Sequence, residues 1–298
     1  MKSDKFLKKI RRIVRWYLPD WGRIFLYKGT QMVNDMRLVL LPVSHVAGVD
    51  NVYHCTVHKA GSQWFKTLFF DPLIYRYSGL KPLFTSVYGI TDLDYRKFRR
   101  KSFPNKRIIT PLYVSYENFC KIDKPRQFRV LYVLRDPRDL VVSMYFSLRY
   151  THVPMGDVMD KRQILKNLSV REGIIWTIQH CAENAVFDSM VSWIDVGDSN
   201  PNLLIVRLED LVGEKYINTL RKILLHSGIR VPDKDLEYLA EKYHFKRVKE
   251  RDHRTTPNGL SHYRSGKPGD WQKYFDEEMV EFFKSVAPGL VERLGYEW

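Results

Sequence analysis

The sequence predicts an α/β fold of three layers, in which helices flank a mostly parallel central sheet. Strand-like segments rich in β-branched and aromatic residues alternate with segments of helical spacing through the centre of the chain. The 298 residues, 44% of them hydrophobic, can bury a large core without disulfide or metal support. The chain shows no internal repeat and no low-complexity tract. These features exclude a largely disordered or collagen-like chain.

Each expected element follows from its local composition. The segments with strand character are 51–58, 107–113, 128–135 and 202–208. The segments with helical character are 63–70, 137–150, 170–193, 215–227 and 276–286. Pro137 suits the first turn of its helix, and Asp276 suits the N-cap of the last one. The stretch 253–270 is rich in glycine and proline, so we expect a loop there.

Residues 1–28 form a distinct basic segment ahead of a single domain expected over residues 29–298. Apolar residues recur in it at helical spacing: Phe6, Ile10, Ile13, Val14 and Tyr17. Such a helix either lies on an anionic membrane or packs its apolar stripe on the domain. The chain has no apolar run of about 18 residues and no secretory signal core. We expect a cytoplasmic protein, either without membrane contact or peripherally attached through residues 1–28.

The charge of the chain favours anionic partners. The 49 Lys and Arg exceed the 34 Asp and Glu, which gives a net charge of +15. No DNA- or RNA-binding module is recognisable, so we expect no nucleic-acid partner. Cys55, Cys120 and Cys181 form no CxxC or Cys/His cluster, so we expect no metal site. The cysteine pattern fits buried thiols in a reducing compartment.

The segment from Val57 to Trp64, with the sequence VHKAGSQW, is the first candidate anion site. It lies where a predicted strand ends and a predicted helix begins, and helix N-termini bind anions through free N–H groups. Gly61 permits close approach of an anion, Ser62 adds a hydroxyl and Lys59 adds a charge. Trp64 either packs in the core or stacks on a base. The lysine precedes the glycine and GxxxxGK[ST] is absent, which argues against a P-loop nucleotide kinase.

Two further segments have the composition of phosphate sites. The stretch 132–145 delivers Arg135 at the end of a predicted strand and Ser143 on the following helix. The alternative for this stretch is a structural ion pair of Arg135 with Asp139. The stretch 263–271, with the sequence YRSGKPGDW, is a basic loop rich in glycine. Its alternative is a surface loop without a ligand.

Together these segments resemble the sulfotransferases that use 3′-phosphoadenosine 5′-phosphosulfate (PAPS). The first resembles the family's PKSGTTW loop, and the second resembles its RNPxDxxVSxY motif. The segment from Arg264 to Trp271 is similar to the RKGxxGDW signature, and residues 204–210 resemble VRYEDL. The three principal motifs agree in order and spacing from about residue 50 to the C-terminus.

The resemblance implies a P-loop-like phosphosulfate-binding loop and transfer of a sulfuryl group from PAPS without a metal. Lys59 would be the catalytic residue, contacting the transferred group. The implied cofactor-binding residues are Lys59, Ala60, Gly61, Ser62, Gln63, Trp64, Arg135, Ser143, Arg264, Ser265 and Gly266. Ala60, Gln63 and Ser265 depart from the family pattern, and each removes or alters one side-chain donor. The acceptor would present a hydroxyl or amine on a saccharide, a lipid or a small alcohol, bound by residues 71–104 and 150–170.

The base that takes the acceptor proton is not evident in the sequence. Pro111 stands where cytosolic relatives carry the histidine of KTHLP. The remaining candidates are Asp71, Asp92, Asp94, Glu117, His253, His262, His54 and His58. The alternative function from another class is a non-catalytic polyanion or nucleic-acid binder on a P-loop-like scaffold. Oligomeric state is not predicted by the sequence.

Overall fold

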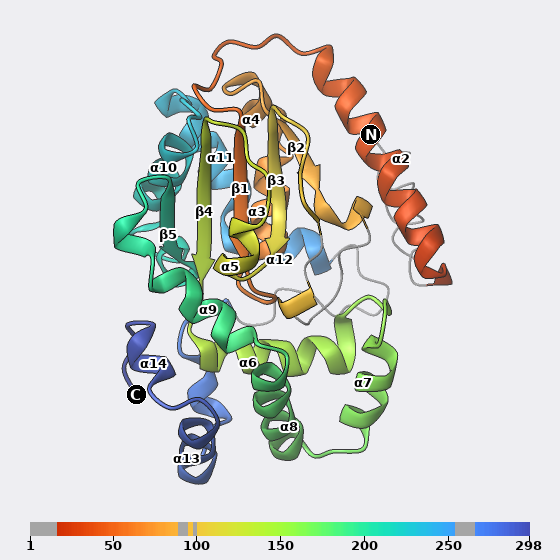
Figure 1. Cartoon of the computed structure of the whole chain (residues 1–298), viewed down its shortest axis with the longest axis vertical. Helices are drawn as coiled ribbons and strands as arrows, with labels where there is room; N and C mark the ends of the chain where they lie inside the picture. Colours follow the sequence, from red (N-terminus) through yellow and green to blue (C-terminus); the bar gives the residue numbers. More distant parts are fainter. Residues whose placement is uncertain (1–16, 89–94, 98–99, 254–265) are drawn as a thin grey trace.

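The computed structural model describes residues 17–88, 95–97, 100–253 and 266–298. Its centre is a sheet of five strands in the order β2-β3-β1-β4-β5, and every neighbouring pair is parallel (Figure 1). The strands are β1 (Asn51–Thr56), β2 (Lys81–Phe84), β3 (Arg107–Tyr113), β4 (Phe128–Leu134) and β5 (Leu203–Arg207). The predicted α/β fold with a parallel sheet is therefore confirmed.

The three central strands begin and end level with one another. Asn51 pairs with Arg107 on one side and with Phe128 on the other, and its side-chain oxygen accepts the Arg107 N–H at 3.0 Å. All six residues of β1 are buried, as expected for a strand that is covered on both faces. Because the strands are parallel and aligned, the loops that follow β1 and β4 leave the same edge of the sheet.

Helices cover both faces of the sheet and its lower edge. One core joins alternate strand residues such as Val52 and Leu131 to α3, α10 and α11, and another joins Tyr53 and Tyr132 to α6, α8, α9 and α13. In Figure 1 the helices α6, α7, α8 and α13 lie beyond the carboxyl ends of the strands. The helices are α2 (Asp20–Val39), α3 (Ser62–Phe69), α4 (Pro72–Arg76), α5 (Tyr116–Cys120), α6 (Pro137–Phe146), α7 (Val158–Lys166), α8 (Val170–Glu183), α9 (Val186–Ile194), α10 (Tyr216–His226), α11 (Asp233–Tyr243), α12 (Phe245–His253), α13 (Glu277–Val286) and α14 (Leu290–Arg293).

Most expected elements are present, with two corrections. The helix expected over 137–150 ends at Phe146 and continues as a π-helical turn, Ser147–Thr151. The helix expected over 170–193 is two helices, because Ala185 adopts a left-handed conformation with φ 55° between them. Asp276 caps α13 as predicted, since its carboxylate accepts the Met279 N–H at 2.8 Å.

β2 was not predicted from the sequence, nor were the helices α4, α5, α7, α11, α12 and α14. β2 contains only four residues and lies at the edge of the sheet. The prediction of buried cysteines is correct for Cys55 and Cys181 and wrong for Cys120, which is exposed; all three are free thiols.

Helix α2 runs without a break across residue 28, where the sequence analysis puts the boundary of the domain. Residues 1–16 of the predicted N-terminal segment lie outside the described residues. In the part of the chain that the structure describes, we find no helix with the length and apolar character needed to cross a membrane.

Candidate active site

A cavity of about 250 Å³ opens at the carboxyl edge of the sheet. Its wall includes residues from each of the three candidate motifs: Lys59 and Gly61 to Trp64 from the first, Arg135 and Ser143 from the second, and Gly266 from the third. The structure thus brings together segments that are far apart in the sequence: Lys59 and Arg135 are separated by 76 residues, and Ser143 and Gly266 by 123. The remaining predicted site residues are Ala60, which is fully buried in the core, and Arg264 and Ser265, which lie outside the described residues.

The loop between β1 and α3 turns its amide groups toward the cavity. Gly61 caps α3 with φ 81°, and Lys59 also adopts a left-handed conformation with φ 72°. Glycine is favoured here because of this left-handed conformation, and a Cβ atom would also lie 2.5 Å from Leu208 Cδ1, so the leucine side chain would have to move. The N–H groups of Gly61, Ser62 and Gln63 donate to no acceptor among the described residues. Unpaired N–H groups at a helix N-terminus are a binding site for an anion.

Two side chains of this loop are fixed by distant elements. The Ser62 hydroxyl accepts a hydrogen bond from the Tyr113 hydroxyl at 2.8 Å, which links the loop to the end of β3. The Trp64 indole N–H donates to the Tyr243 carbonyl at 2.7 Å, and the ring is only 5% exposed. Trp64 therefore packs in the core while it also lines the cavity.

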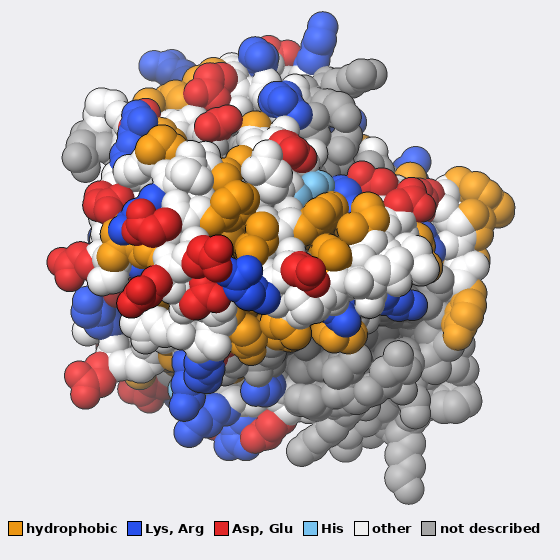
Figure 2. Space-filling view, turned by 90° about the horizontal axis from the view of Figure 1, so that it is seen from below, with side chains coloured by type: hydrophobic (Ala, Val, Ile, Leu, Met, Phe, Trp, Pro, Cys, Tyr) orange, Lys and Arg blue, Asp and Glu red, His pale blue; other side chains and the backbone are white. Residues whose placement is uncertain are grey.

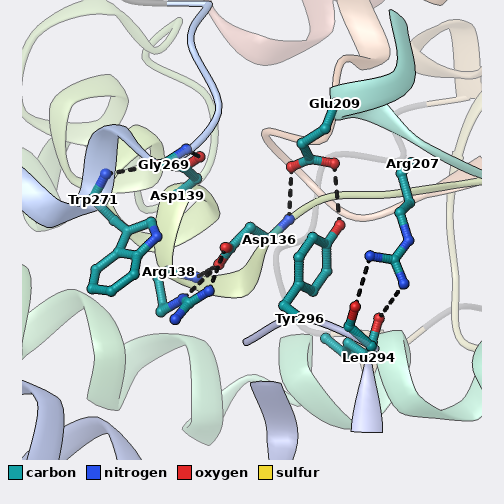
Figure 3. A network of polar contacts seen from close by, with 10 residues as sticks. Asp136, Arg138, Asp139, Arg207, Glu209, Gly269, Trp271, Leu294 and Tyr296 are labelled. Atoms are coloured by element: carbon teal, nitrogen blue, oxygen red, sulfur yellow. Dashed lines mark hydrogen bonds and ion pairs between the residues drawn. The ribbon is translucent and has the colours of Figure 1, made fainter. Parts of the chain in front are cut away.

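Arg135 follows β4 directly and reaches back to the first loop. Its Nη1 donates to the Lys59 carbonyl at 2.9 Å. The alternative reading of the sequence paired Arg135 with Asp139 in a structural ion pair. Instead, the Asp139 carboxylate accepts the N–H groups of Gly269 at 2.9 Å and Trp271 at 2.8 Å (Figure 3). Asp139 thus links the second motif segment to the third by two hydrogen bonds.

The same network ties the end of β4 to the C-terminus (Figure 3). Asp136 caps α6 and forms two hydrogen bonds with Arg138, whose guanidinium lies 4.0 Å from the Trp271 ring centroid. Glu209 accepts the Asp136 N–H at 3.0 Å and the Tyr296 hydroxyl at 3.1 Å. Burial raises the pKa of the Glu209 carboxyl and that of the Asp139 carboxyl above their ordinary values.

Arg207 of the segment that resembles VRYEDL contributes to this network on its far side. Its guanidinium donates to the backbone carbonyls of Leu294 and Gly295. This segment therefore links the last strand to the chain end. It also places Leu208 and Glu209 in the cavity wall.

Two histidines line the cavity, and their hydrogen bonds define different tautomers. His152 Nδ1 lies 3.1 Å from the Val153 carbonyl, which only accepts, so in the neutral ring Nδ1 carries the proton and Nε2 carries the lone pair. Tyr95 Oη accepts the His58 backbone N–H at 2.7 Å and lies 3.0 Å from His58 Nδ1, where its own hydroxyl proton can be donated to that nitrogen. His58 Nε2 then carries the ring proton.

Burial keeps both rings neutral. Loss of solvent lowers the pKa of His152 to about 4, although its hydrogen bond to Val153 acts in the opposite direction. Burial lowers the pKa of His58 well below its ordinary value, and the nearby His152 and Lys59 add to the effect. The two rings lie 6.5 Å apart, and His58 stacks on Tyr113 at 3.7 Å.

Of the base candidates named from the sequence, His58 alone is among the described residues that line the cavity. Asp71 is buried and bonded to Lys242 and Tyr243, and His54 is buried on β1 and bonded to Thr110 of β3. Glu117 is exposed on α5. Asp92, Asp94 and His262 lie outside the described residues, as does the side chain of His253. The sequence analysis missed His152, because only the fold brings it to His58.

The comparison with protein families decides the identity of the domain. Residues 49–295 match the family model described as "Sulfotransferase domain". The chain belongs to this family. The match covers the whole sheet and all three candidate motifs, so the predicted family and its sulfotransferase activity are confirmed.

Individual relatives are distant. A 3-alpha-hydroxysteroid sulfotransferase of Cavia porcellus is 24% identical over 167 residues, which cover 53% of this chain and 54% of that protein. This match therefore spans about half the length of that relative. Sulfotransferase 2A2 of Mus musculus is 25% identical over 263 residues, or 85% of this chain and 82% of that protein.

Solved structures share the fold of this sulfotransferase. The mouse sulfotransferase SULT7A1 complexed with PAP has a TM-score of 0.54 at 20% identity, over 82% of this chain and 85% of that one. Retinol dehydratase in complex with androsterone and the inactive cofactor PAP has a TM-score of 0.57 at 17% identity, over 83% and 82%. The alternative of a non-catalytic polyanion binder is not favoured by these comparisons.

Proposed function

We propose that this sulfotransferase transfers a sulfuryl group from PAPS to a hydroxyl or amine in the cavity at the carboxyl edge of its sheet. The convergence of the three motif segments on one cavity carries the proposal. The residues fit an anionic nucleotide. The cavity is lined by the cationic side chains Lys59 and Arg135 and by the unpaired backbone amides at the N-terminus of α3. Among the described residues we find no cluster of acidic, histidine or cysteine side chains that could hold a metal.

The residue roles follow from position in the cavity wall. PAPS supplies the activated sulfuryl group, and the Gly61, Ser62 and Gln63 amides would hold its 5′-phosphosulfate. Lys59 would stabilise the charge that develops as the group is transferred. Arg135, Ser143 and Gly266 would bind the 3′-phosphate, with Arg264 and Ser265 proposed on the resemblance alone. Trp64 would border the adenine, and Ala60 would shape the loop from within the core.

We propose His152 as the base that takes the acceptor proton. Its Nε2 lone pair has no hydrogen-bond partner among the described residues, and the ring lines the cavity. An anion bound beside it raises the basicity of the ring. His58 would donate from Nε2 to the acceptor or to a sulfuryl oxygen. This division of roles supplies an acceptor and a donor where Pro111 leaves no histidine.

The tautomers are directly measurable by nitrogen-15 NMR of histidine-labelled protein. We expect His152 to show a protonated Nδ1 and His58 a protonated Nε2 at neutral pH, because their partners impose these forms. Burial lowers the pKa of His152 to about 4, so its Nε2 should stay unprotonated at every pH at which the protein is folded. The variants His152→Gln and His58→Gln assign the signals. A protonated Nε2 on His152 would exclude its role as the base.

The acceptor side of the cavity favours an apolar alcohol over a saccharide. Its wall includes Tyr27, Phe84, Tyr113 and Met155, together with the two histidines. Apolar and aromatic walls with few polar groups bind hydrophobic ligands. Relatives named for hydroxysteroids support the same class. We propose a small lipid or lipid-like alcohol as the acceptor, which narrows the predicted range of saccharide, lipid or small alcohol.

The finer predictions on location also remain proposals. We propose a cytoplasmic protein without nucleic-acid partners, in which residues 1–28 contact a membrane peripherally and residues 29–298 form the catalytic domain. The basic segment and the free cysteines support this arrangement.

Calorimetric binding of PAP, adenosine 3′,5′-bisphosphate, tests the nucleotide site. We expect the wild type to bind and Arg135→Ala to lose about tenfold to a hundredfold in affinity, since charge-assisted phosphate contacts are lost. Arg293→Ala is the matched control, because this exposed arginine pairs with Asp195 on the surface. Its affinity should equal that of the wild type. No PAP binding by folded wild type would refute the proposed function.

A further inference from the structure

Helix α2 lies against the sheet with its polar side chains turned inward. Gln31 is 9% exposed; its Nε2 donates to the Pro82 carbonyl at 2.8 Å and its Oε1 accepts the Phe84 N–H at 3.1 Å. Asp35 forms a two-fold ion pair with Arg107 at 2.8 and 2.9 Å. These contacts satisfy backbone groups of the edge strand β2 and fix α2 along it (Figure 1).

The opposite face of α2 is apolar and open. The exposed fractions are 75% for Trp21, 77% for Phe25, 61% for Met32, 64% for Met36 and 59% for Val39. These residues recur at three-, four- and seven-residue intervals, so they form one stripe. A surface helix of a soluble domain has the reverse orientation, with apolar residues inward. In Figure 2, hydrophobic side chains gather at the right-hand edge, the side on which α2 lies in Figure 1.

The charged residues around this apolar stripe favour an anionic partner. Both acidic residues of α2 form ion pairs: Asp35 pairs with Arg107, and Asp20 pairs with Arg23 at 2.6 Å. Exposed Lys28 and Arg37 remain on α2. The sequence that precedes the described residues adds seven basic residues against one acidic residue: Lys2, Lys5, Lys8, Lys9, Arg11, Arg12, Arg15 and Asp4. An apolar stripe bordered by cations matches the interface of an anionic bilayer.

We propose that the outward face of α2 docks in the headgroup region of an anionic lipid bilayer. Trp21 and Phe25 enter the interface, where aromatic rings are favoured, and the basic residues meet the lipid phosphates. A second copy of the chain is a poorer occupant, because the net charge of +15 opposes self-association.

Docking places the acceptor side of the cavity beside the bilayer. Tyr27, on α2, lines the cavity and packs edge-on against Phe84 with a centroid distance of 5.2 Å. The Arg23 guanidinium bonds to the Pro154 carbonyl, next to the lining residues Val153 and Met155. A lipid-like alcohol then reaches the site from the membrane. This consequence rests on the proposed function, and the docking itself extends the membrane contact proposed there for residues 1–28 to the outward face of α2.

Co-sedimentation of the full chain with vesicles tests the docking. We expect binding to phosphatidylcholine vesicles that contain phosphatidylserine, little binding to pure phosphatidylcholine, and weakening by salt. The double variant Trp21→Gln/Phe25→Gln should bind at least about tenfold more weakly, because it lacks the two aromatic side chains that enter the bilayer. The matched control is Leu225→Gln/Tyr238→Gln, which changes two side chains that are 56% and 53% exposed on α10 and α11. It should bind like the wild type.

Two outcomes overturn the proposal. Equal vesicle binding by the wild type and the α2 variant would show that the stripe does not enter the membrane. A wild-type dimer that dissociates in the α2 variant, seen by sedimentation velocity, would show that a second copy covers the stripe. PAP binding by each variant, measured in parallel, verifies folding and separates a failure of docking from a failure of the proposed function.

Discussion

Replacing Asp139 by alanine is expected to destabilise the protein by about 3 kcal/mol or more and to weaken PAP binding. Asp139 is 1% exposed and accepts two N–H groups, those of Gly269 and Trp271. Without the carboxylate, the buried Trp271 N–H and the partly buried Gly269 N–H both lose their partner, and a buried donor without a partner costs about 1–3 kcal/mol. The released loop also carries Gly266 to Pro268, which line the cavity. Urea unfolding and calorimetric titration with PAP measure the two effects.

The sign of the change in PAP affinity distinguishes two roles of Asp139. If its charge alone mattered, removal of a carboxylate from the cavity wall would strengthen the binding of an anion. If it holds the loop, affinity falls. Asp195→Ala is the control, because Asp195 is an exposed partner of Arg293 and its loss should change stability by less than about 1 kcal/mol. Tighter PAP binding by a stable Asp139→Ala variant would show that Asp139 does not hold the loop in the conformation that binds PAP.

Local patterns in the sequence suffice to predict four of the five strands and the three motif segments. The strands β1, β3, β4 and β5 are short, apolar and followed by helices, and the motif residues stand directly after two of them. Since the carboxyl ends of parallel strands lie at one edge of the sheet, the proximity of Lys59 and Arg135 can be predicted from the strand assignments alone. The Arg135–Lys59 contact at 2.9 Å is the direct result of this topology.

Features that depend on long-range packing could not be predicted in this way. His152 follows a π-helical turn, and its proximity to His58 depends on how that turn packs over the sheet edge. The orientation of α2 depends on Gln31 and Asp35 meeting β2 and Arg107, residues that no local pattern connects. Nearness in sequence suggests an ion pair of Asp139 with Arg135 as the alternative to a phosphate site, whereas the N–H groups that Asp139 accepts lie about 130 residues away.

Acid is expected to unfold this protein at about pH 4.5, because several histidines are buried in neutral form. Burial lowers the pKa of His54 to about 3 and that of His152 and His180 to about 4, and it lowers that of His58 as well. Below about pH 6.5 the unfolded chain takes up protons that the folded protein does not. The free energy of unfolding therefore decreases as the pH is lowered. His54, His152 and His180 together contribute about 4 kcal/mol per pH unit between their ordinary and their lowered pKa values. Asp139 and Glu209, whose pKa is raised, oppose this loss.

The variant His54→Asn tests whether buried histidines cause the acid sensitivity. His54 bonds to Thr110 through Nδ1 at 2.8 Å, and its buried Nε2 has no partner among the described residues, so protonation there finds no acceptor. An amide can keep the bond to Thr110 but cannot titrate, so the slope of stability against pH should fall by about 1.4 kcal/mol per pH unit. His45→Asn, in the partly exposed loop before β1, is the control and should keep the wild-type slope. Urea unfolding between neutral pH and about pH 5, above the pH of acid unfolding, gives each slope. An identical slope for His54→Asn and the wild type would assign the acid sensitivity to other groups, since the folded state could then accommodate the charged ring of His54.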